Sequence, residues 1–396
     1  MIPVIVIGTS AYSRKLYRLI RSVYNPYAKE HGFEELSVMA FFDMFDETDQ
    51  VSDDTLDGLL LLNRYGFSEI IKTDRIQFVL LPQQPELDVQ FLIHFLRENR
   101  VYQDMIYFTM QKLLEQDEYT DRDIENLMIP YAEASYLPYL EFHIEDSCNM
   151  NCKACEHYSP LVKASPQTRM VFNEVKQDFQ KLKSLIDDIG RIRILGGEPL
   201  LNPELSEYVK MIRQTYPLAD IFIVTNALLL HRLPEETYAV IKEANASFMI
   251  SYYPPLEGKI EEIEAVPKAK GIRVLRTPLI REFSLRQNLD GHNDPEWEYE
   301  HCFQSTCINV YRGRIGTCML PFMTHYFNET FHTEIPEDGG IDLYDPALTT
   351  VSLKQQLEKP LKRCAYCGQP KNVPWKRVNK EPDLRDFILM EEKDDA

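Results

Sequence analysis

The chain has 396 residues, 44% of them hydrophobic and 27% charged, which is typical of a folded globular protein and excludes a disordered or fibrous chain. The 43 Lys and Arg against 62 Asp and Glu give a net charge of −19, which disfavours nucleic acid as a partner because phosphate backbones are also negative. No run approaches the ~18 apolar residues of a membrane helix, and the opening MIPVIVIGTS lacks the basic stretch of a signal peptide. We therefore expect a cytoplasmic protein without a membrane partner.

The first 130 residues alternate between strand-like and helix-like patterns. This alternation predicts an α/β, Rossmann-like domain over residues 1–130 with a small, mostly parallel sheet. The turn after the first strand keeps only Gly8 of the dinucleotide-binding fingerprint, and the nearest acidic residue, Asp43, follows about 35 residues later rather than ~20. Recognition of a substrate or partner, or simple packing, is therefore favoured over NAD binding. The expected strands are 4–10, 37–43, 77–83 and 104–109.

A second series of strand and helix patterns follows. It predicts a partial (β/α)6 barrel of the TIM type over residues 131–295, with its chemistry at the C-terminal ends of the strands. From residue 296 the pattern changes to a hairpin, with its turn at Arg312-Gly313, and a short helix, which predicts a further domain over 296–375. Residues 376–396 are expected to form an acidic tail. The expected barrel strands are 139–146, 191–197, 220–226, 247–253 and 272–278.

The eight cysteines carry the strongest signal. None precedes Cys148, and in a reducing compartment such clusters indicate metal rather than disulfides. Cys148, Cys152 and Cys155 form a CxxxCxxC run just after the first barrel strand. Three thiolates can bind three irons of a [4Fe–4S] cube and leave the fourth iron open, as a catalytic site requires. The alternative is a zinc knuckle with His157 as its fourth ligand.

A second motif, GGEP at 196–199, ends the next predicted strand. Two residues without side chains expose backbone polar groups to a ligand, and a carboxylate follows immediately. Together the two motifs resemble the radical S-adenosylmethionine (radical SAM) superfamily, over roughly residues 139–280. That resemblance implies that SAM chelates the open iron and that one electron from the cluster cleaves it to a 5′-deoxyadenosyl radical, which abstracts a substrate hydrogen.

The resemblance also implies roles for individual residues. Ala154 stands where relatives have an aromatic residue near the adenine, so Tyr158 is the candidate to replace it. The implied cluster ligands are Cys148, Cys152 and Cys155, and the implied SAM contacts are Gly196, Gly197, Glu198, Pro199, Asn226 and Ser251.

The remaining cysteines resemble the twitch domain, a half-size SPASM domain that holds an auxiliary cluster, with a spacing similar to that of 2-deoxy-scyllo-inosamine dehydrogenase. The implied ligands of this second [4Fe–4S] cluster are Cys302, Cys318, Cys364 and Cys367, with a structural zinc site as the alternative. Cys307 is then left over. It is a buried inert thiol, a replacement ligand, or a catalytic hydrogen-atom donor of an epimerase.

Polar residues also recur at every second position of the first two barrel strands, so that each set points the same way. They form either a polar lumen for substrate or a charge-paired layer between strands. His157, Tyr252 and Tyr253 lie near predicted strand ends and are candidates for substrate contact or packing. The alternating residues are Glu141, His143, Glu145, Arg191 and Arg193.

These features favour a radical SAM oxidoreductase that dehydrogenates or epimerises a small polar substrate, a sugar or nucleotide-linked sugar, with flavodoxin or ferredoxin as its reductant. The sugar assignment rests on the resemblance of the N-terminal domain to those of carbohydrate-modifying enzymes. The alternatives are a maturase that modifies a ribosomal peptide and a non-catalytic iron–sulfur protein. A peptide maturase commonly carries a winged-helix element at its N-terminus, which residues 1–130 do not resemble.

Overall fold

The computed structural model describes residues 1–48, 50, 54–73, 75–84, 89–379 and 381–389. The chain divides into two compact units, Met1–Ser135 and Tyr136–Ala396, so the first boundary falls five residues beyond the predicted one. No helix in the described part of the chain is long and apolar enough to cross a membrane.

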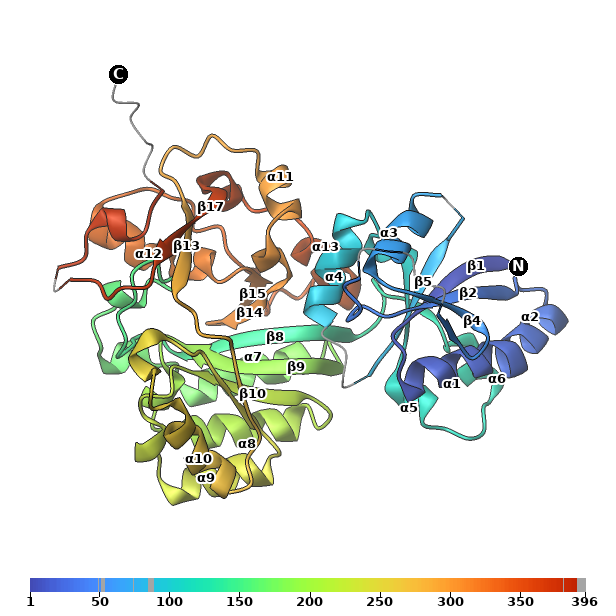
Figure 1. The fold of residues 1–396 in the computed structure, drawn as a ribbon, viewed down its shortest axis with the longest axis horizontal. Coiled ribbons are helices and arrows are strands. Elements are labelled where there is room, and N and C mark those ends of the chain that lie inside the picture. Colours follow the sequence, from blue (N-terminus) through green and yellow to red (C-terminus); the bar gives the residue numbers. More distant parts are fainter. Residues whose placement is uncertain (49, 51–53, 74, 85–88, 380, 390–396) are drawn as a thin grey trace. The chain divides into compact units, whose positions relative to one another are not determined.

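The N-terminal unit is built on a seven-stranded sheet. Its strands are β1 (Ile2–Ile7), β2 (Leu36–Phe42), β3 (Thr55–Leu56), β4 (Leu59–Leu62), β5 (Phe78–Pro82), β6 (Ile106–Thr109) and β7 (Ile129–Pro130). Its helices are α1 (Ala11–Leu19), α2 (Asn25–His31), α3 (Arg64–Ile71), α4 (Val89–Glu98), α5 (Gln111–Leu114) and α6 (Asp121–Glu125). The order β3-β4-β2-β1-β5-β6-β7 leaves β4, β2, β1, β5 and β6 parallel and an antiparallel strand at each edge. Helices α3 and α4 cover one face, and the other four cover the opposite face (Figure 1).

The strand order of this sheet reverses between β1 and β5. A cavity of about 80 Å³ lies there, lined by Gly8 after β1, Asp43 after β2 and Gln84 after β5. Gly8 has a φ of 82°, and a Cβ atom at this position would lie 2.6 Å from Nε2 of Gln84, so both the turn and the packing need glycine. The structure thus brings Asp43 beside Gly8 despite their separation in sequence.

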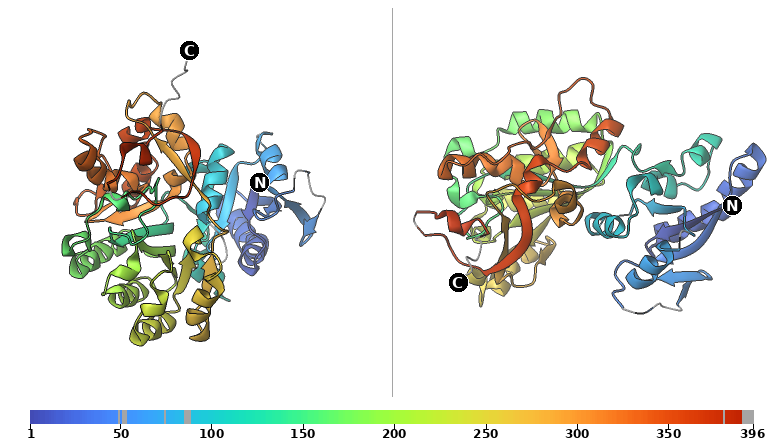
Figure 2. Two further views of the ribbon diagram at one scale, coloured as in Figure 1. Left: turned by 60° about the vertical axis from the view of Figure 1, so that its left-hand side comes forward. Right: turned by 90° about the horizontal axis from the view of Figure 1, so that it is seen from above.

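The second unit contains an eight-stranded sheet in the order β12-β11-β10-β9-β8-β14-β15-β16. Its strands are β8 (Tyr136–Glu145), β9 (Asp188–Gly196), β10 (Asp220–Thr225), β11 (Ser247–Ile250), β12 (Val274–Arg276), β14 (Ile308–Tyr311), β15 (Arg314–Thr317) and β16 (Ile341–Asp342). The connecting helices are α7 (Phe172–Lys183), α8 (Leu205–Thr215), α9 (Glu235–Glu243) and α10 (Ile260–Ala269). These four helices lie along one side of the sheet (Figures 1 and 2).

The C-terminal third of the chain continues this sheet. Strand β14 pairs in parallel with β8, so six parallel strands stand side by side and all ten residues of β8 are buried. The first strand of the domain predicted over 296–375 is therefore hydrogen-bonded to β8, the first strand of the predicted barrel. The remaining elements are β13 (Glu282–Gln287), β17 (Cys367–Pro374), α11 (Pro295–Glu300), α12 (Leu320–Phe331) and α13 (Thr350–Leu357).

Two local features of this region bear on the predictions. Arg312 and Gly313 both have positive φ, at 48° and 77°, which suits the predicted two-residue hairpin turn between β14 and β15. The tail predicted from residue 376 is packed as far as residue 389. The amide of Ala154 donates to the carbonyl of Asp386, and Phe387 is 3% exposed. The acidic residues 391–396 lie outside the described part.

Candidate functional site

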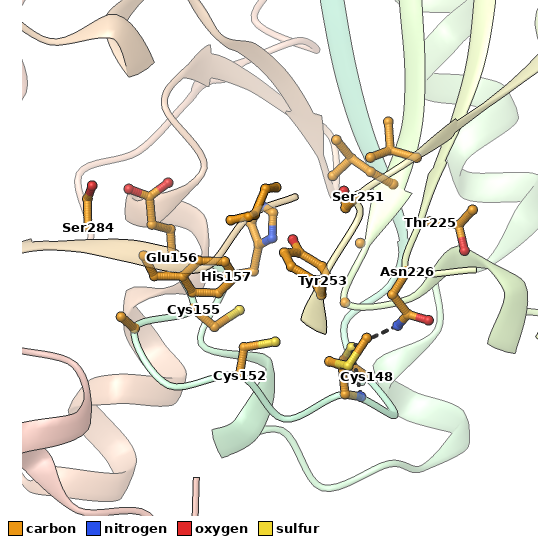
Figure 3. Close-up of a pocket in the computed structure, with 18 of the residues that line it drawn as sticks. Cys148, Cys152, Cys155, Glu156, His157, Thr225, Asn226, Ser251, Tyr253 and Ser284 are labelled. Atoms are coloured by element: carbon orange, nitrogen blue, oxygen red, sulfur yellow. Dashed lines mark hydrogen bonds between the residues drawn. The ribbon is translucent and has the colours of Figure 1, made fainter. Parts of the chain in front are cut away.

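A cavity of about 460 Å³ lies where the predicted motifs meet (Figure 3). Its lining comes from the loop after β8, the ends of β9 and β10, the segment after β11 and strand β13. Because the C-terminal ends of parallel strands meet at one edge of the sheet, residues far apart in sequence converge there. The predicted site residues that line it are Cys148, Cys152, Cys155, Gly196, Gly197, Asn226 and Ser251.

The three loop cysteines suit an iron–sulfur cluster. Burial and neighbouring negative charge raise the pKa of both Cys148 and Cys152 to about 12, and burial raises the pKa of Cys155. Buried thiols of this kind release their protons when a metal centre binds them. Within the described residues, no three His, Cys, Asp or Glu side chains converge on a point that would hold a single metal ion. A cube, in which each of the three thiolates binds a different iron, fits this arrangement better than zinc, which draws its ligands around one ion.

The paired glycines are required by packing against the cysteine loop. A Cβ atom on Gly196, whose φ is 154°, would lie 2.0 Å from the carbonyl oxygen of Glu145. A Cβ atom on Gly197 would lie 2.3 Å from the carbonyl oxygen of Ser147. The amide of Gly197 donates to that carbonyl of Glu145 at 2.7 Å. Both glycines line the cavity. Their backbones also hold the segment just before Cys148 in place.

Glu198 and Pro199 are not among the described residues that line the cavity, which differs from the predicted contact with SAM. The Glu198 side chain is fully buried, and it accepts hydrogen bonds from the Thr225 hydroxyl at 2.7 Å and the amide of Asn226 at 2.9 Å. Burial raises the pKa of this carboxyl group to about 7. Glu198 therefore ties the GGEP turn to the end of β10.

Asn226, which follows β10, contacts the cysteine loop through its side chain. Its amide nitrogen donates to Oδ1 of Asn149 at 2.7 Å and approaches Sγ of Cys148 at 3.7 Å, the contact drawn in Figure 3. Ser251 lies at the end of the neighbouring strand, where its amide donates to the carbonyl of Thr225. Tyr253 also lines the cavity, as one of the tyrosines that the sequence indicated.

Tyr158, the candidate to replace the missing aromatic residue, is not among the described residues that line the cavity. It is 2% exposed and hydrogen-bonded to the side chains of Gln287 and Arg363. Ala154 lines the cavity in a left-handed conformation, with a φ of 58°. The Tyr158 ring is packed into the core of the unit, and its contact with the adenine stays a prediction.

The segment after β17 holds the outer side of the cysteine loop, which the sequence did not indicate. The indole Nε1 of Trp375 donates to Sγ of Cys152 at 3.2 Å. The amide of Lys153 donates to the carbonyl of Lys376 at 2.8 Å, and the amide of Val378 donates to that of Asn151 at 2.9 Å. These partners stand more than 200 positions apart in sequence, so no local pattern could reveal them.

The cysteines of the predicted second set act on one another electrostatically. Burial raises the pKa of Cys318 well above its ordinary value, and the neighbouring Cys302 and Cys367 raise it further. Burial raises the pKa of Cys364 to about 11, with Cys367 and Cys302 adding to the shift. A second cluster held by Cys302, Cys318, Cys364 and Cys367 stays a prediction.

Arg286 connects the two cysteine sets. This β13 residue lines the 460 Å³ cavity and donates from Nη1 to Sγ of Cys302 at 3.1 Å. Its Nε lies 3.7 Å from the carboxylate of Glu156, which also lines the cavity and accepts a hydrogen bond from Gln304 at 2.7 Å. The cavity therefore has a polar wall on the side of the second cysteine set.

Cys307, the cysteine left over from the two sets, lies beside the second set, because the amide of Cys318 donates to its carbonyl at 2.9 Å. It is 5% exposed, lies just before β14 and is not among the described residues that line the cavity. Burial raises its pKa well above the ordinary value, and Glu141 and Cys318 raise it further. This position favours an inert thiol over a hydrogen-atom donor.

The alternating polar residues form mainly a charge-paired layer. Glu141 accepts a hydrogen bond from Tyr139 and lies 3.6 Å from Arg193, its partner in the register of β8 and β9. Glu145 pairs with Arg169 at 3.1 Å. His143 instead lies edge-on against the ring of His157, which lines the cavity.

Comparison with known proteins agrees with the motifs. Residues 144–259 match the family model described as the radical SAM superfamily. Two GTP 3′,8-cyclases are similar: that of Sulfurimonas denitrificans is 34% identical over 111 residues (28% of this chain, 34% of that protein). That of Campylobacter jejuni subsp. doylei is 37% identical over 93 residues (23% and 28%). The chain thus spans about a third of the length of the curated relatives it matches.

Two solved structures are also similar. BtrN in complex with AdoMet and 2-DOIA has a TM-score of 0.37 and 19% identity, covering 59% of this chain and 93% of that one. SuiB of Streptococcus suis bound to S-adenosylmethionine has a TM-score of 0.31 and 14% identity, covering 45% and 43%. The family match, the CxxxCxxC loop and the cavity around it identify a radical SAM domain at residues 144–259, which implies a [4Fe–4S] cluster and SAM.

Proposed function

We propose that this protein is a radical SAM oxidoreductase with two [4Fe–4S] clusters that oxidises an alcohol of a small polar substrate, a sugar or nucleotide-linked sugar. The observation that carries the proposal is the position of Arg286, which lines the cavity and also donates to Cys302. A substrate in this cavity would therefore lie between the two cysteine sets.

The residues divide into three groups by position. Cys148, Cys152 and Cys155 would hold the first cluster, with Gly196, Gly197, Asn226 and Ser251 around SAM. Cys302, Cys318, Cys364 and Cys367 would hold the second. When bound, the first cluster with SAM supplies a radical that removes a hydrogen atom, and the second accepts one electron. Loss of a hydrogen atom, a proton and an electron converts the alcohol to a carbonyl compound.

The polar wall of the cavity suits a substrate rich in hydroxyl groups. Glu156 presents carboxylate oxygens that accept hydrogen bonds and can take the hydroxyl proton. Ser284 and Gln304 add neutral groups that both donate and accept, and Arg286 adds a donor. The buried position of Cys307 favours oxidation over epimerisation, because an epimerase needs a hydrogen-atom donor at the substrate.

The test is anaerobic reconstitution of the full chain, with iron and sulfide counted before dithionite and SAM are added. About eight irons per chain and release of 5′-deoxyadenosine are expected, since each cluster contains four irons. Nucleotide sugars are then compared with free sugars and a leader peptide, and the product is examined by mass spectrometry for a loss of two hydrogens. About four irons would refute the two-cluster enzyme, and product only from the peptide would establish a maturase instead. Flavodoxin and ferredoxin are tested as replacements for dithionite.

A further inference from the structure

Arg363 is a buried cation with unusual surroundings. It immediately precedes Cys364 and is 2% exposed. Its Nε donates to the Thr324 hydroxyl at 2.8 Å, and its Nη2 donates to the Tyr158 hydroxyl at 2.8 Å and to Oε1 of Gln287 at 2.5 Å. Its Nη1 lies 3.6 Å from Sγ of Cys367. Within the described ranges, no carboxylate forms an ion pair with this guanidinium group.

The acidic groups nearby are engaged elsewhere. Glu156 forms its ion pair with Arg286 at 3.7 Å. Asp338 accepts hydrogen bonds from the backbone amides of Lys362 and Arg363. These hydrogen bonds fix the backbone of Arg363 and do not involve its guanidinium group. The side chains that contact the guanidinium group are Thr324, Tyr158, Gln287 and Cys367, which carry no charge while their hydroxyl and thiol groups are protonated.

A buried charge without a counter-charge is costly, by several kcal/mol. The four cysteines provide a counter-charge only as thiolates. Binding of iron deprotonates them, and a cube held by four thiolates carries net negative charge. The guanidinium group and such a cluster therefore neutralise one another.

We propose that Arg363 is the counter-charge of the second cluster, holding it in place and raising its reduction potential. The proposal rests on the two-cluster function proposed above. A fixed positive charge favours the more negative, reduced state, which makes the cluster a better electron acceptor. Tyr158 orients the guanidinium group, and because Tyr158 follows Cys155 by three residues it also links Arg363 to the loop of the first cluster. Arg363 is a positioning residue, since it is not among the described residues that line the cavity.

The test is a redox titration of the reconstituted full chain, followed by electron paramagnetic resonance, for the wild type and the variants Arg363→Met, Arg363→Gln and Arg363→Lys. The Met and Gln variants are expected to shift the midpoint potential of the second cluster to more negative values, and the Lys variant to stay near the wild type. Trp375→Phe is the matched control, because Trp375 contacts Cys152 and should shift only the first cluster. Unchanged potentials in both uncharged variants would overturn the proposal.

The uncharged variants can instead lose the second cluster, which iron analysis shows directly. Loss of about four irons in the Met and Gln variants but not in Lys supports a requirement for the charge. Equal loss in the Lys variant overturns it in favour of a purely structural role. If the wild type itself holds only about four irons, the two-cluster function fails before any variant is compared.

Discussion

Replacing Gly197 with alanine should damage the cluster loop without altering any cysteine. The added Cβ atom would lie 2.3 and 2.5 Å from the carbonyl oxygens of Ser147 and Asp146, where ordinary contacts begin at 3.4 Å. The two backbones must then separate by about 1 Å, and overpacking of this kind costs ~1–3 kcal/mol. Two hydrogen bonds between these backbones, at 2.7 and 3.0 Å, would also weaken at about 1 kcal/mol each. The expected loss is on the order of 3–5 kcal/mol in the free energy of unfolding.

The displaced backbone leads directly into Cys148, so the effect should reach the chemistry. A misplacement of about 1 Å at a reacting centre can lower the rate by roughly 10²-fold. Iron content, 5′-deoxyadenosine release and denaturant unfolding are measured for Gly197→Ala beside Gly258→Ala. Gly258 has a φ of 74° with no atom near its Cβ position, so its variant bears only the strain of the left-handed backbone, ~1–2 kcal/mol, and keeps its cluster. Wild-type iron content and rate in Gly197→Ala would refute the assigned role of this contact.

Three further predictions follow from single residues. Cys307→Ser should leave product formation intact. Cys302→Ala should lose product formation and about four irons, yet still release 5′-deoxyadenosine. Loss of product in Cys307→Ser alone, detected by mass spectrometry, would favour an epimerase. Trp375→Phe removes a hydrogen bond to Cys152 and should lower the midpoint potential of the first cluster, and an unchanged value in a redox titration would contradict this. Burial lowers the pKa of Lys354 from 10.5 to about 7, so unfolding takes up a proton between these values and stability rises with pH. Relative to Lys354→Met, the wild type should therefore gain on the order of 4 kcal/mol in the free energy of unfolding between pH 7 and 10. Denaturant titrations in which this free energy changes equally with pH in the two proteins would contradict the prediction.

Local sequence was sufficient for the parts of the protein that depend on short spacings. The βα alternation predicted a parallel-dominated α/β fold, and the structure confirms it with two such sheets. Short apolar runs were harder to interpret, and strand β4 (Leu59–Leu62) was missed because four consecutive leucines show no period of two. The CxxxCxxC and GGEP motifs were found because each lies in one loop, where spacing alone sets which atoms meet.

The roles of Glu198 and Tyr158 show where this reasoning stops. Both stand beside a motif, yet Glu198 faces Thr225 and Asn226 on the next strand, and Tyr158 faces Arg363, 205 residues later. A sequence motif indicates which side chains are near one another but not which way each one points. That direction depends on which neighbouring element offers a partner to a polar group as it becomes buried.

The sequence by itself determined the cysteine loop, the glycine pair and the class of chemistry that they imply, because these depend on residue types a few positions apart. Only the tertiary structure decided that Arg286 stands between the cavity and Cys302, that Arg363 lies buried against Cys367, and that Trp375 reaches Cys152. Trp375 and Cys152 stand 223 positions apart and Arg286 and Cys302 stand 16 apart, so local spacing does not encode these contacts. Arg363 and Cys367 stand only four positions apart, but the burial of Arg363 depends on the packing of other segments around it.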